Sequence, residues 1–352
     1  MGQESQPAES EPAASLPAAS SPSAGAPAAA PSAGRPTARG RQAAGPRTVT
    51  VNLSIVDFTS LSDVDATFDV IAYLAESWND PALAQPGAPP QRRLKETETW
   101  TPKLTVLDAL ELKPDLDFGY WADPDGNVQH EIRFRSRHKS ELSFQRFPFD
   151  SQSLFISIWS PPNSAEDLII DPAKTTVEVL PTAQLGGWTI QGATFKVENP
   201  KGSRATGSWS ELNASVTVER NTTYFTWKVF VPLLLFVTIA WSASWIDPKQ
   251  IAAQNAAAIA TLLTTVAFNF TVGASQPRVS YFTFYDAFNL VCFGFIAMTL
   301  LFVGFAHALE TRSVGLAAAA RARFAGKYLL PVYLIAGILG TALYFLVLAP
   351  RG

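Results

Sequence analysis

The stretch that most constrains this chain is residues 250–274, which combine the length of a membrane-spanning helix with many polar side chains. At a rise of about 1.5 Å per residue, a helix of this length crosses the hydrocarbon core of a bilayer. Its polar residues after Gln250 are Gln254, Asn255, Thr261, Thr264, Thr265, Asn269 and Thr271. Because lipid offers these groups no hydrogen-bond partners, one face of the helix must border protein or water. The segment therefore predicts a helix that lines an aqueous pathway.

The 352-residue chain divides at Arg220 into a half without long apolar runs and a half that contains four of them. The overall value of 47% hydrophobic residues averages over these two halves and describes neither. We expect residues 221–352 to form a transmembrane domain, with helices at about 225–246, 250–274, 284–308 and 328–348.

Residues 47–220 carry the pattern of an all-β domain. Seven segments alternate in hydrophobicity or are rich in β-forming residues, and they include 49–58, 131–144 and 188–199. Turn signals such as Pro124-Asp125-Gly126-Asn127 separate them. We therefore expect one immunoglobulin-like β-sandwich. Residues 1–46 are rich in Ala, Pro and Ser, lack aromatic residues and are predicted to be a disordered extension.

The basic residues predict how the chain crosses the membrane. The connection after the third apolar segment holds Arg312, Arg321, Arg323 and Lys327 against Glu310, whereas the connection before it holds only Arg278. Loops rich in Lys and Arg stay in the cytoplasm. Four spans then put the β domain and both termini outside the cell (inner) membrane.

The charge of the β domain differs from that of the whole chain. Residues 51–219 contain 24 acidic and 14 basic residues, while the complete chain has a net charge of −3. An acidic domain above a pore concentrates cations at its mouth, although ordinary surface charge that keeps a domain soluble is the alternative explanation.

The sequence shows no constellation typical of an enzyme. Cys292 is the single cysteine and the three histidines form no cluster at metal-ligand spacing, so neither a disulfide nor a transition-metal site is indicated. We expect no catalytic residue, cofactor, bound metal or nucleic-acid partner.

Several short motifs carry a resemblance to a known family. The run Phe147-Pro148-Phe149-Asp150-Ser151-Gln152 matches an FPFDxQ pattern, and the other matching motifs are Trp78-Asn79-Asp80, Arg93-Leu94, Trp100-Thr101-Pro102, Glu219-Arg220-Asn221, Ala267-Phe268-Asn269 and Pro277-Arg278. Over about residues 48–349 the chain resembles the Cys-loop receptor superfamily, and in particular its prokaryotic pentameric ligand-gated channels. Ser140 and Leu154 stand where the family's bridging cysteines would be, so packing and hydrogen bonds must hold that loop.

The resemblance implies a homopentamer in membrane lipid, with the second helix of each subunit lining a central pore. It places on the lumenal side Ala252, Ala256, Ala260, Leu263, Ala267 and Phe270. Rings of Leu263 and Phe270 would form an apolar gate, since narrow apolar rings exclude water. Helix packing is the alternative role of Leu263. We expect Thr261, Thr264, Thr265 and Asn269 on the flanks of this stripe, bonded between helices or to water.

The resemblance also implies loops that couple the sandwich to the pore. These are the hairpin Thr59–Asp65 and the residues Phe147, Pro148, Phe149, Asp150, Arg220, Pro277 and Arg278. Asp150 and Arg220 have the charges to form a partly buried pair. Alternatively, Arg220 only anchors a helix end by extending toward the lipid headgroups.

An agonist site would lie between β domains, where aromatic residues can cage an amine through cation–π attraction. The candidates are Trp100, Tyr120, Trp121, Trp159 and Trp209. The match to the family weakens here, because Pro161 stands at the family's usual aromatic position and Trp159 lies two residues earlier. Each candidate could instead be a core or interface residue.

Together with its charge pattern, the resemblance thus implies a ligand-gated channel for monovalent cations, opened by a small molecule such as an amine, or by protons. Selectivity is the weak point, since Ala252, Ala253 and Gln254 stand where cation channels of this family carry glutamates. An anion-selective channel of the same family and a membrane-tethered sensor domain remain alternatives. A transporter would need broken helices or charged residues within the spans, and Asp286 is the only acidic residue there.

Overall fold

The computed structural model describes residues 45–198, 208–247, 249–273, 276, 279–311 and 316–348. The predicted extension over 1–46 therefore lies almost entirely outside the described residues, and so do the two predicted coupling residues Pro277 and Arg278.

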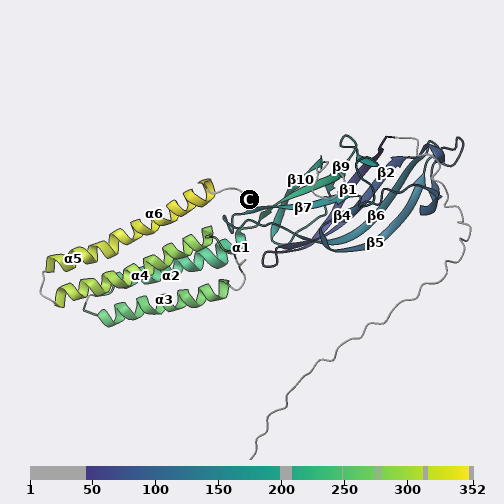
Figure 1. The fold of residues 1–352 in the computed structure, drawn as a ribbon. Helices are drawn as coiled ribbons and strands as arrows, with labels where there is room; N and C mark the ends of the chain where they lie inside the picture. Colours follow the sequence, from purple (N-terminus) through teal and green to yellow (C-terminus); the bar gives the residue numbers. More distant parts are fainter. Residues whose placement is uncertain are drawn as a thin grey trace, which may run out of the picture. The chain divides into compact units, whose positions relative to one another are not determined.

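The first part of the chain folds into two β-sheets that pack as a sandwich (Figure 1). One sheet has the strand order β3-β5-β6-β2-β1-β8, and β9 also pairs with β1. Its strands are β1 (Arg47–Ser62), β2 (Thr67–Asn79), β3 (Arg92–Leu94), β5 (Ala109–Ala122), β6 (Asn127–Lys139), β8 (Leu168–Ile170) and β9 (Thr176–Val179). The other sheet has the order β10-β11-β7-β4, formed by β4 (Thr105–Leu107), β7 (Ser151–Trp159), β10 (Trp188–Glu198) and β11 (Glu211–Arg220).

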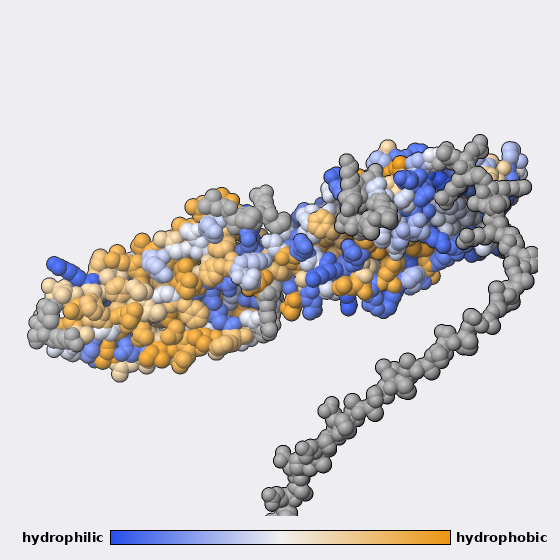
Figure 2. Space-filling model, viewed as in Figure 1, coloured by the Kyte–Doolittle hydropathy of each residue, from blue (hydrophilic) through white to orange (hydrophobic). Residues whose placement is uncertain are grey.

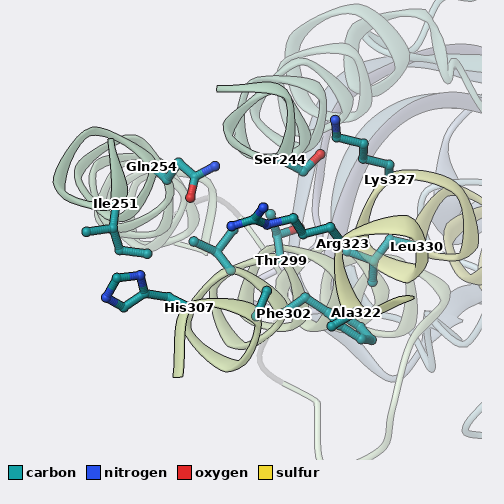
Figure 3. A pocket seen from close by; sticks show the side chains of 13 residues that line it. Ser244, Ile251, Gln254, Thr299, Phe302, His307, Ala322, Arg323, Lys327 and Leu330 are labelled. Carbon is teal, nitrogen blue, oxygen red and sulfur yellow. The ribbon is translucent and has the colours of Figure 1, made fainter. Parts of the chain in front are cut away.

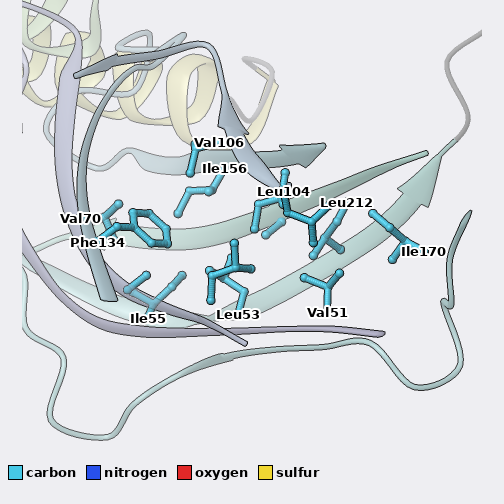
Figure 4. Close-up of a cluster of buried hydrophobic side chains, with 14 of the residues drawn as sticks. Val51, Leu53, Ile55, Val70, Leu104, Val106, Phe134, Ile156, Ile170 and Leu212 are labelled. Atoms are coloured by element: carbon cyan, nitrogen blue, oxygen red, sulfur yellow. The ribbon is translucent and has the colours of Figure 1, made fainter. Parts of the chain in front are cut away.

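Alternating apolar residues on facing strands build the core of the sandwich. Val49, Val51, Leu53 and Ile55 of β1 are fully buried, and so are the apolar residues of β7 and β11 opposite them. Figure 4 shows part of this cluster, with side chains from both sheets pointing toward one another. The period of two seen in the sequence thus reflects strands with one face in a shared core.

One long strand, β5, was not predicted from the sequence. β5 pairs with β6 through most of its length, yet nearly all its side chains from Leu110 to Phe118 are exposed. Pro114 interrupts the pattern expected of a paired strand, and the register shifts on both sides of it. Conversely, the strand expected over 131–144 ends at Lys139, and a loop follows it.

The second part of the chain is helical, and α4 (Phe284–Thr311) is its central helix. It contacts α2 (Val231–Ser242), α3 (Ile251–Gly273), α5 (Leu316–Phe324) and α6 (Leu330–Leu343). The remaining helical turns of this part are α1 (Thr223–Phe225), η3 (Thr226–Phe230), η4 (Ala243–Trp245), η5 (Ala325–Leu329) and η6 (Tyr344–Leu348). Two short 3-10 turns, η1 (Pro81–Leu83) and η2 (Glu96–Glu98), lie in the sandwich loops.

Two wide π-helical turns accompany prolines in the helices. η3 runs directly into α2, whose second residue is Pro232, and η5 runs directly into α6, whose second residue is Pro331. A proline removes one backbone donor and crowds the preceding turn, so a locally wider turn accommodates it. The first membrane-spanning helical segment therefore accommodates Pro232 through a π turn.

The last helix begins earlier than the sequence analysis expected. Helical structure extends from Leu316 through α5 and η5 into α6, rather than starting near residue 328. The cause is the run LAAAARARF, because alanine and arginine have high intrinsic helix propensity. Arg321, Arg323 and Lys327 hence lie on a helix and not in a loop.

Four of the described helical segments are long and apolar enough to cross a membrane: Thr223–Trp245, Ile251–Gly273, Phe284–Thr311 and Ala317–Val347. On the face shown in Figure 2, hydrophobic surface gathers over the helices and hydrophilic surface over the sandwich.

Candidate functional site: the junction of sandwich and helices, and the α3 face

Arg220, the last residue of β11, holds two loops of the sandwich together. Its guanidinium donates to both carboxylate oxygens of Asp150, at 2.8 and 3.1 Å, and to Asp63 Oδ2 in the β1–β2 hairpin at 2.7 Å. The predicted pair of Asp150 and Arg220 is therefore present, and Asp63 makes it a triad. The guanidinium also lies over the rings of Trp188, at 4.1 Å, and Phe147, at 4.9 Å.

The triad is buried, so its charges depend on one another. Burial alone would lower the pKa of Arg220, but the hydrogen bonds and charges of Asp150 and Asp63 outweigh burial and raise it. A charge in such a place persists only when it is paired and hydrogen-bonded. Arg220 is thus a fixed internal link rather than an anchor that extends to the lipid surface.

Gln152 closes the loop that lacks the family's two cysteines. Its side-chain amide accepts from the main-chain N–H of Ser143, at 2.9 Å, and donates to the carbonyl of the same residue, at 2.8 Å. The amide also donates to Asp150 Oδ2 at 2.6 Å. Leu154 is fully buried, and Ser140 donates its main-chain N–H to the Ala66 carbonyl. Gln152 is the last residue of the FPFDxQ motif, and its role could not be predicted from the sequence.

The loop 144–150 contacts the helices through aromatic rings and two hydrogen bonds. Phe147 is buried, and the centre of its ring lies 4.9 Å from that of Phe225. The ring centre of Phe149 lies 5.2 Å from that of Phe284, the first residue of α4. The Phe147–Pro148 peptide bond between them is cis. The Phe144 N–H donates to the Tyr281 hydroxyl at 2.8 Å, and the Phe284 N–H donates to the Gln145 carbonyl at 2.9 Å. Movement of this loop would therefore act directly on the ends of two membrane helices.

α3 turns one side toward the other helices and leaves the opposite side exposed. The buried side carries Gln254, Ala258, Thr261 and Thr265. The exposed side includes all six residues predicted to line a pore, with Leu263 64% and Phe270 79% exposed.

The polar residues of α3 are arranged differently from the expectation. The hydroxyls of Thr261, Thr264 and Thr265 donate to carbonyls of their own helix, four residues earlier, instead of bridging to other helices. Thr261 and Thr265 lie on the buried side rather than beside the exposed stripe. Asn269 does bond between helices, because its Oδ1 accepts from Tyr285 and Asn289 of α4.

Comparison with known proteins identifies the class of molecule to which these features belong. Residues 32–222 match the family described as the neurotransmitter-gated ion-channel ligand binding domain. This match covers the sandwich and more than half of the chain. The chain belongs to the neurotransmitter-gated ion-channel family.

Sequence similarity to individual members of this ion-channel family extends beyond the sandwich into the helices. The proton-gated ion channel of Gloeobacter violaceus is 28% identical over 306 residues, which are 85% of this chain and 84% of the relative. The gamma-aminobutyric acid receptor subunit beta-like of Drosophila melanogaster is 27% identical over 279 residues, and subunit rho-2 of Rattus norvegicus is 27% identical over 267. The chain spans only about half the length of these two receptor subunits. The family consists of ligand-gated ion channels, not enzymes, and the four candidate spans fit a multi-pass membrane protein.

The aromatic residues proposed for an agonist site in this ion-channel subunit fall into separate groups. Trp100 and Tyr120 pack against Trp78 at the edge of the core, and Arg47 lies 4.7 Å over the Trp100 ring. Trp121 lies beside Arg93, which is 5.8 Å from its ring. Trp159, the last residue of β7, and Trp209, just before β11, form an edge-to-face pair. Within one subunit the five residues therefore do not form a single cage.

A small pocket of about 30 Å³ lies among the helices of the channel subunit, and it was not predicted from the sequence. Its lining includes Gln254, Thr299, His307, Arg323 and Lys327, which Figure 3 shows coming from several helices. In the sequence, the polar residues that occur within several of the apolar segments could have indicated this pocket. Arg323 bonds Glu310, and Lys327 lies 4.9 Å over the Trp245 ring.

Proposed function

We propose that five copies of this chain form a ligand-gated ion channel in the cell membrane, with the α3 helices around the pore. The observation that carries this proposal is the exposed α3 stripe of Ala252, Ala256, Ala260, Leu263, Ala267 and Phe270. The first four residues of this stripe along the sequence are three alanines and Leu263. Small and apolar side chains of this kind suit a narrow water path that apolar rings can close. Coupling runs through the Arg220 triad, the loop 147–150 and, by resemblance, Pro277 and Arg278.

The permeating ions are monovalent cations in this proposal. The supporting feature is the acidic β domain, with 24 acidic against 14 basic residues over 51–219. α3 itself contains no charged residue from Ile251 to Gly273, so the selectivity that we expect is modest and arises mainly from the domain at the mouth.

Recordings from purified protein in planar bilayers test both the channel and its ions. Stepwise single-channel currents are expected for a channel, and none for a membrane-tethered sensor. In a sodium chloride gradient the reversal potential should shift toward the sodium equilibrium potential. A shift toward the chloride equilibrium potential would establish the anion-selective alternative.

Protons are the agonist that we favour. Support comes from the relative named as a proton-gated channel, whose similarity covers more than four fifths of both chains. A small amine is the second candidate, because Trp100, Tyr120, Trp121, Trp159 and Trp209 supply rings that attract cations. Currents recorded during steps of external pH, and then during a panel of amines at constant pH, distinguish these two agonists.

The proposed orientation places the β domain and both termini outside the cytoplasm. A single cysteine introduced at Asp125, in the exposed β5–β6 turn, can test it, because the only natural cysteine, Cys292, is buried. Labelling by a membrane-impermeant thiol reagent on intact cells is expected; labelling only after lysis would reverse the orientation.

A further inference from the structure

A second group of ionisable side chains lies in the sandwich, apart from the Arg220 triad. Glu76 of β2 and His130 of β6 are cross-strand partners, only 6% and 8% exposed. They lie on the strand faces that also carry the core residues Leu74 and Phe134. His130 Nδ1 is 2.6 Å from Glu76 Oε1, and its Nε2 is 3.1 Å from Asp117 Oδ1 on β5. Both ring nitrogens therefore face a carboxylate oxygen.

This geometry sets the number of protons that the group holds. A neutral imidazole has a single N–H, so one of its two nitrogens would point a lone pair at a carboxylate oxygen. Both contacts become hydrogen bonds when the ring is protonated, or when Glu76 is protonated and donates to Nδ1. In either case the group contains one proton more than a neutral ring with two carboxylates, and the titration belongs to the group as a whole.

The neighbouring groups favour retention of that proton. Burial lowers the pKa of His130, but Glu76 and Asp117 together raise it above its ordinary value. Burial raises the pKa of Glu76, whose Oε2 is buried without a hydrogen-bond partner among the described residues. Tyr120 of β5 stacks on the His130 ring at 4.1 Å, and burial, followed by the charges of Glu76, Glu96 and Asp117, raises the pKa of its hydroxyl.

Loss of the proton would act on the surface of the sandwich through Asp117. Glu76 is enclosed, whereas the Asp117 side chain is 63% exposed and can turn to water. Asp117 also accepts from the Gly119 N–H at 2.7 Å, in a bulge where Gly119 has a φ of +77°. The same bulge presents Phe118, whose carbonyl accepts from the Trp121 indole. Release of Asp117 would thus loosen the support of an exposed aromatic segment.

We propose that Glu76, His130 and Asp117 together bind the proton by which this channel responds to external acid. The inference rests on the proposed function as a proton-opened channel. Protonation fastens the Asp117 bulge to the core, and deprotonation frees it. Among the described residues, Glu76 and Asp117 are the carboxylates that lie within hydrogen-bond distance of a His130 ring nitrogen.

The main test compares pH–current curves of the full chain with those of two conservative variants. In Glu76→Gln, and equally in Asp117→Asn, an amide can donate to one nitrogen of a neutral ring while the other nitrogen keeps its N–H bond. Each variant is therefore expected to hold the fastened arrangement at any pH and to lose most of the pH dependence. Asp115→Asn, the same substitution two residues away on β5, is the matched control and should leave the curve unchanged.

A readout that does not require channel activity is the titration of the histidine rings by NMR in the full chain. The chain has three histidines, so ring-labelled protein gives three resolvable signals, which His138→Phe and His307→Phe assign. The His130 signal should remain that of the protonated group above pH 6.5 and titrate at a lower pH in Glu76→Gln, because that variant removes the Glu76 charge.

The outcomes separate the inference from the proposed function. Wild-type currents that depend on pH, together with unchanged curves in both variants, would overturn the inference and leave the channel intact. Absence of current at every pH would overturn the channel proposal, while the NMR titration would still test the proton site. A His130 signal that shows the group already without its extra proton at pH 6.5 in the wild type would refute the site directly.

Discussion

At the scale of single residues, Arg220 is the side chain on which the junction depends most. Arg220→Ala would leave Asp150, whose side chain is 2% exposed, as a buried charge without a cation, and Asp63, 18% exposed, as a partly buried one. Removing one partner of a buried pair costs about 3–5 kcal/mol of unfolding free energy. We expect a large drop in the thermal midpoint of the detergent-purified protein and loss of agonist-evoked current.

Controls for this prediction separate charge from geometry. Arg220→Lys keeps the charge but cannot donate twice to Asp150 while reaching Asp63, so it should be intermediate. Arg135→Ala removes an exposed arginine of the same domain and should change the midpoint little. Normal currents and stability in Arg220→Ala would refute the role of the triad.

His138 makes the β domain sensitive to acid in a direction opposite to that of His130. It is buried against Phe68, and burial lowers its pKa to about 4. The unfolded chain takes up this proton near pH 6.5, whereas the folded chain takes it up near pH 4. The stabilisation is therefore complete above about pH 6.5 and is lost progressively down to about pH 4, by about 3 kcal/mol.

The measurement is the thermal midpoint of the full chain as a function of pH, in wild type and in His138→Phe. The variant should lose the part of the acid sensitivity between pH 6.5 and pH 4 that is due to His138. Because the raised pKa of His130 acts in both proteins, the difference between the two curves isolates His138. Identical slopes in the two proteins would contradict the prediction.

At the scale of elements, α3 decides whether the closed channel holds back ions. Leu263→Thr replaces a proposed apolar ring with smaller side chains that carry hydroxyls, which lowers the barrier to wetting. We expect current without agonist and opening at lower agonist concentration. Ile259→Thr is the matched control, because Ile259 is also exposed on α3 but lies at the edge of that face, outside the six residues of the stripe. Equal effects of both substitutions would show that Leu263 acts through helix packing.

The same elements show how far the sequence could lead. The sandwich strands with one buried face, such as β1, are visible in the sequence as alternating patterns, and the first three membrane helices as long apolar runs. The FPFDxQ motif points to the family. β5 was missed because Pro114 and two exposed faces remove the usual signal. Asp63, Gln152 and His130 could not be assigned, because their partners lie 157, 9 and 54 positions away in the sequence, and only the fold brings them together.

At the scale of the whole molecule, the proposal joins an acidic domain to an uncharged pore helix. Long-range charge acts over about 10 Å at 0.1 M salt and over about 3 Å at 1 M. If the domain concentrates cations, its contribution to conductance must be large in dilute salt and small in concentrated salt.

Replacing exposed acidic residues of the sandwich tests this in one variant, Glu98→Gln together with Asp125→Asn and Glu131→Gln. Each of the three is exposed and lacks a salt bridge among the described residues. We expect single-channel cation conductance to fall in 20 mM salt and to match wild type in 1 M salt. Gln91→Glu with Gln129→Glu, which adds charge at exposed positions, should have the opposite effect. A rise in conductance on neutralisation would instead favour permeating anions, because an acidic mouth would then have been excluding them.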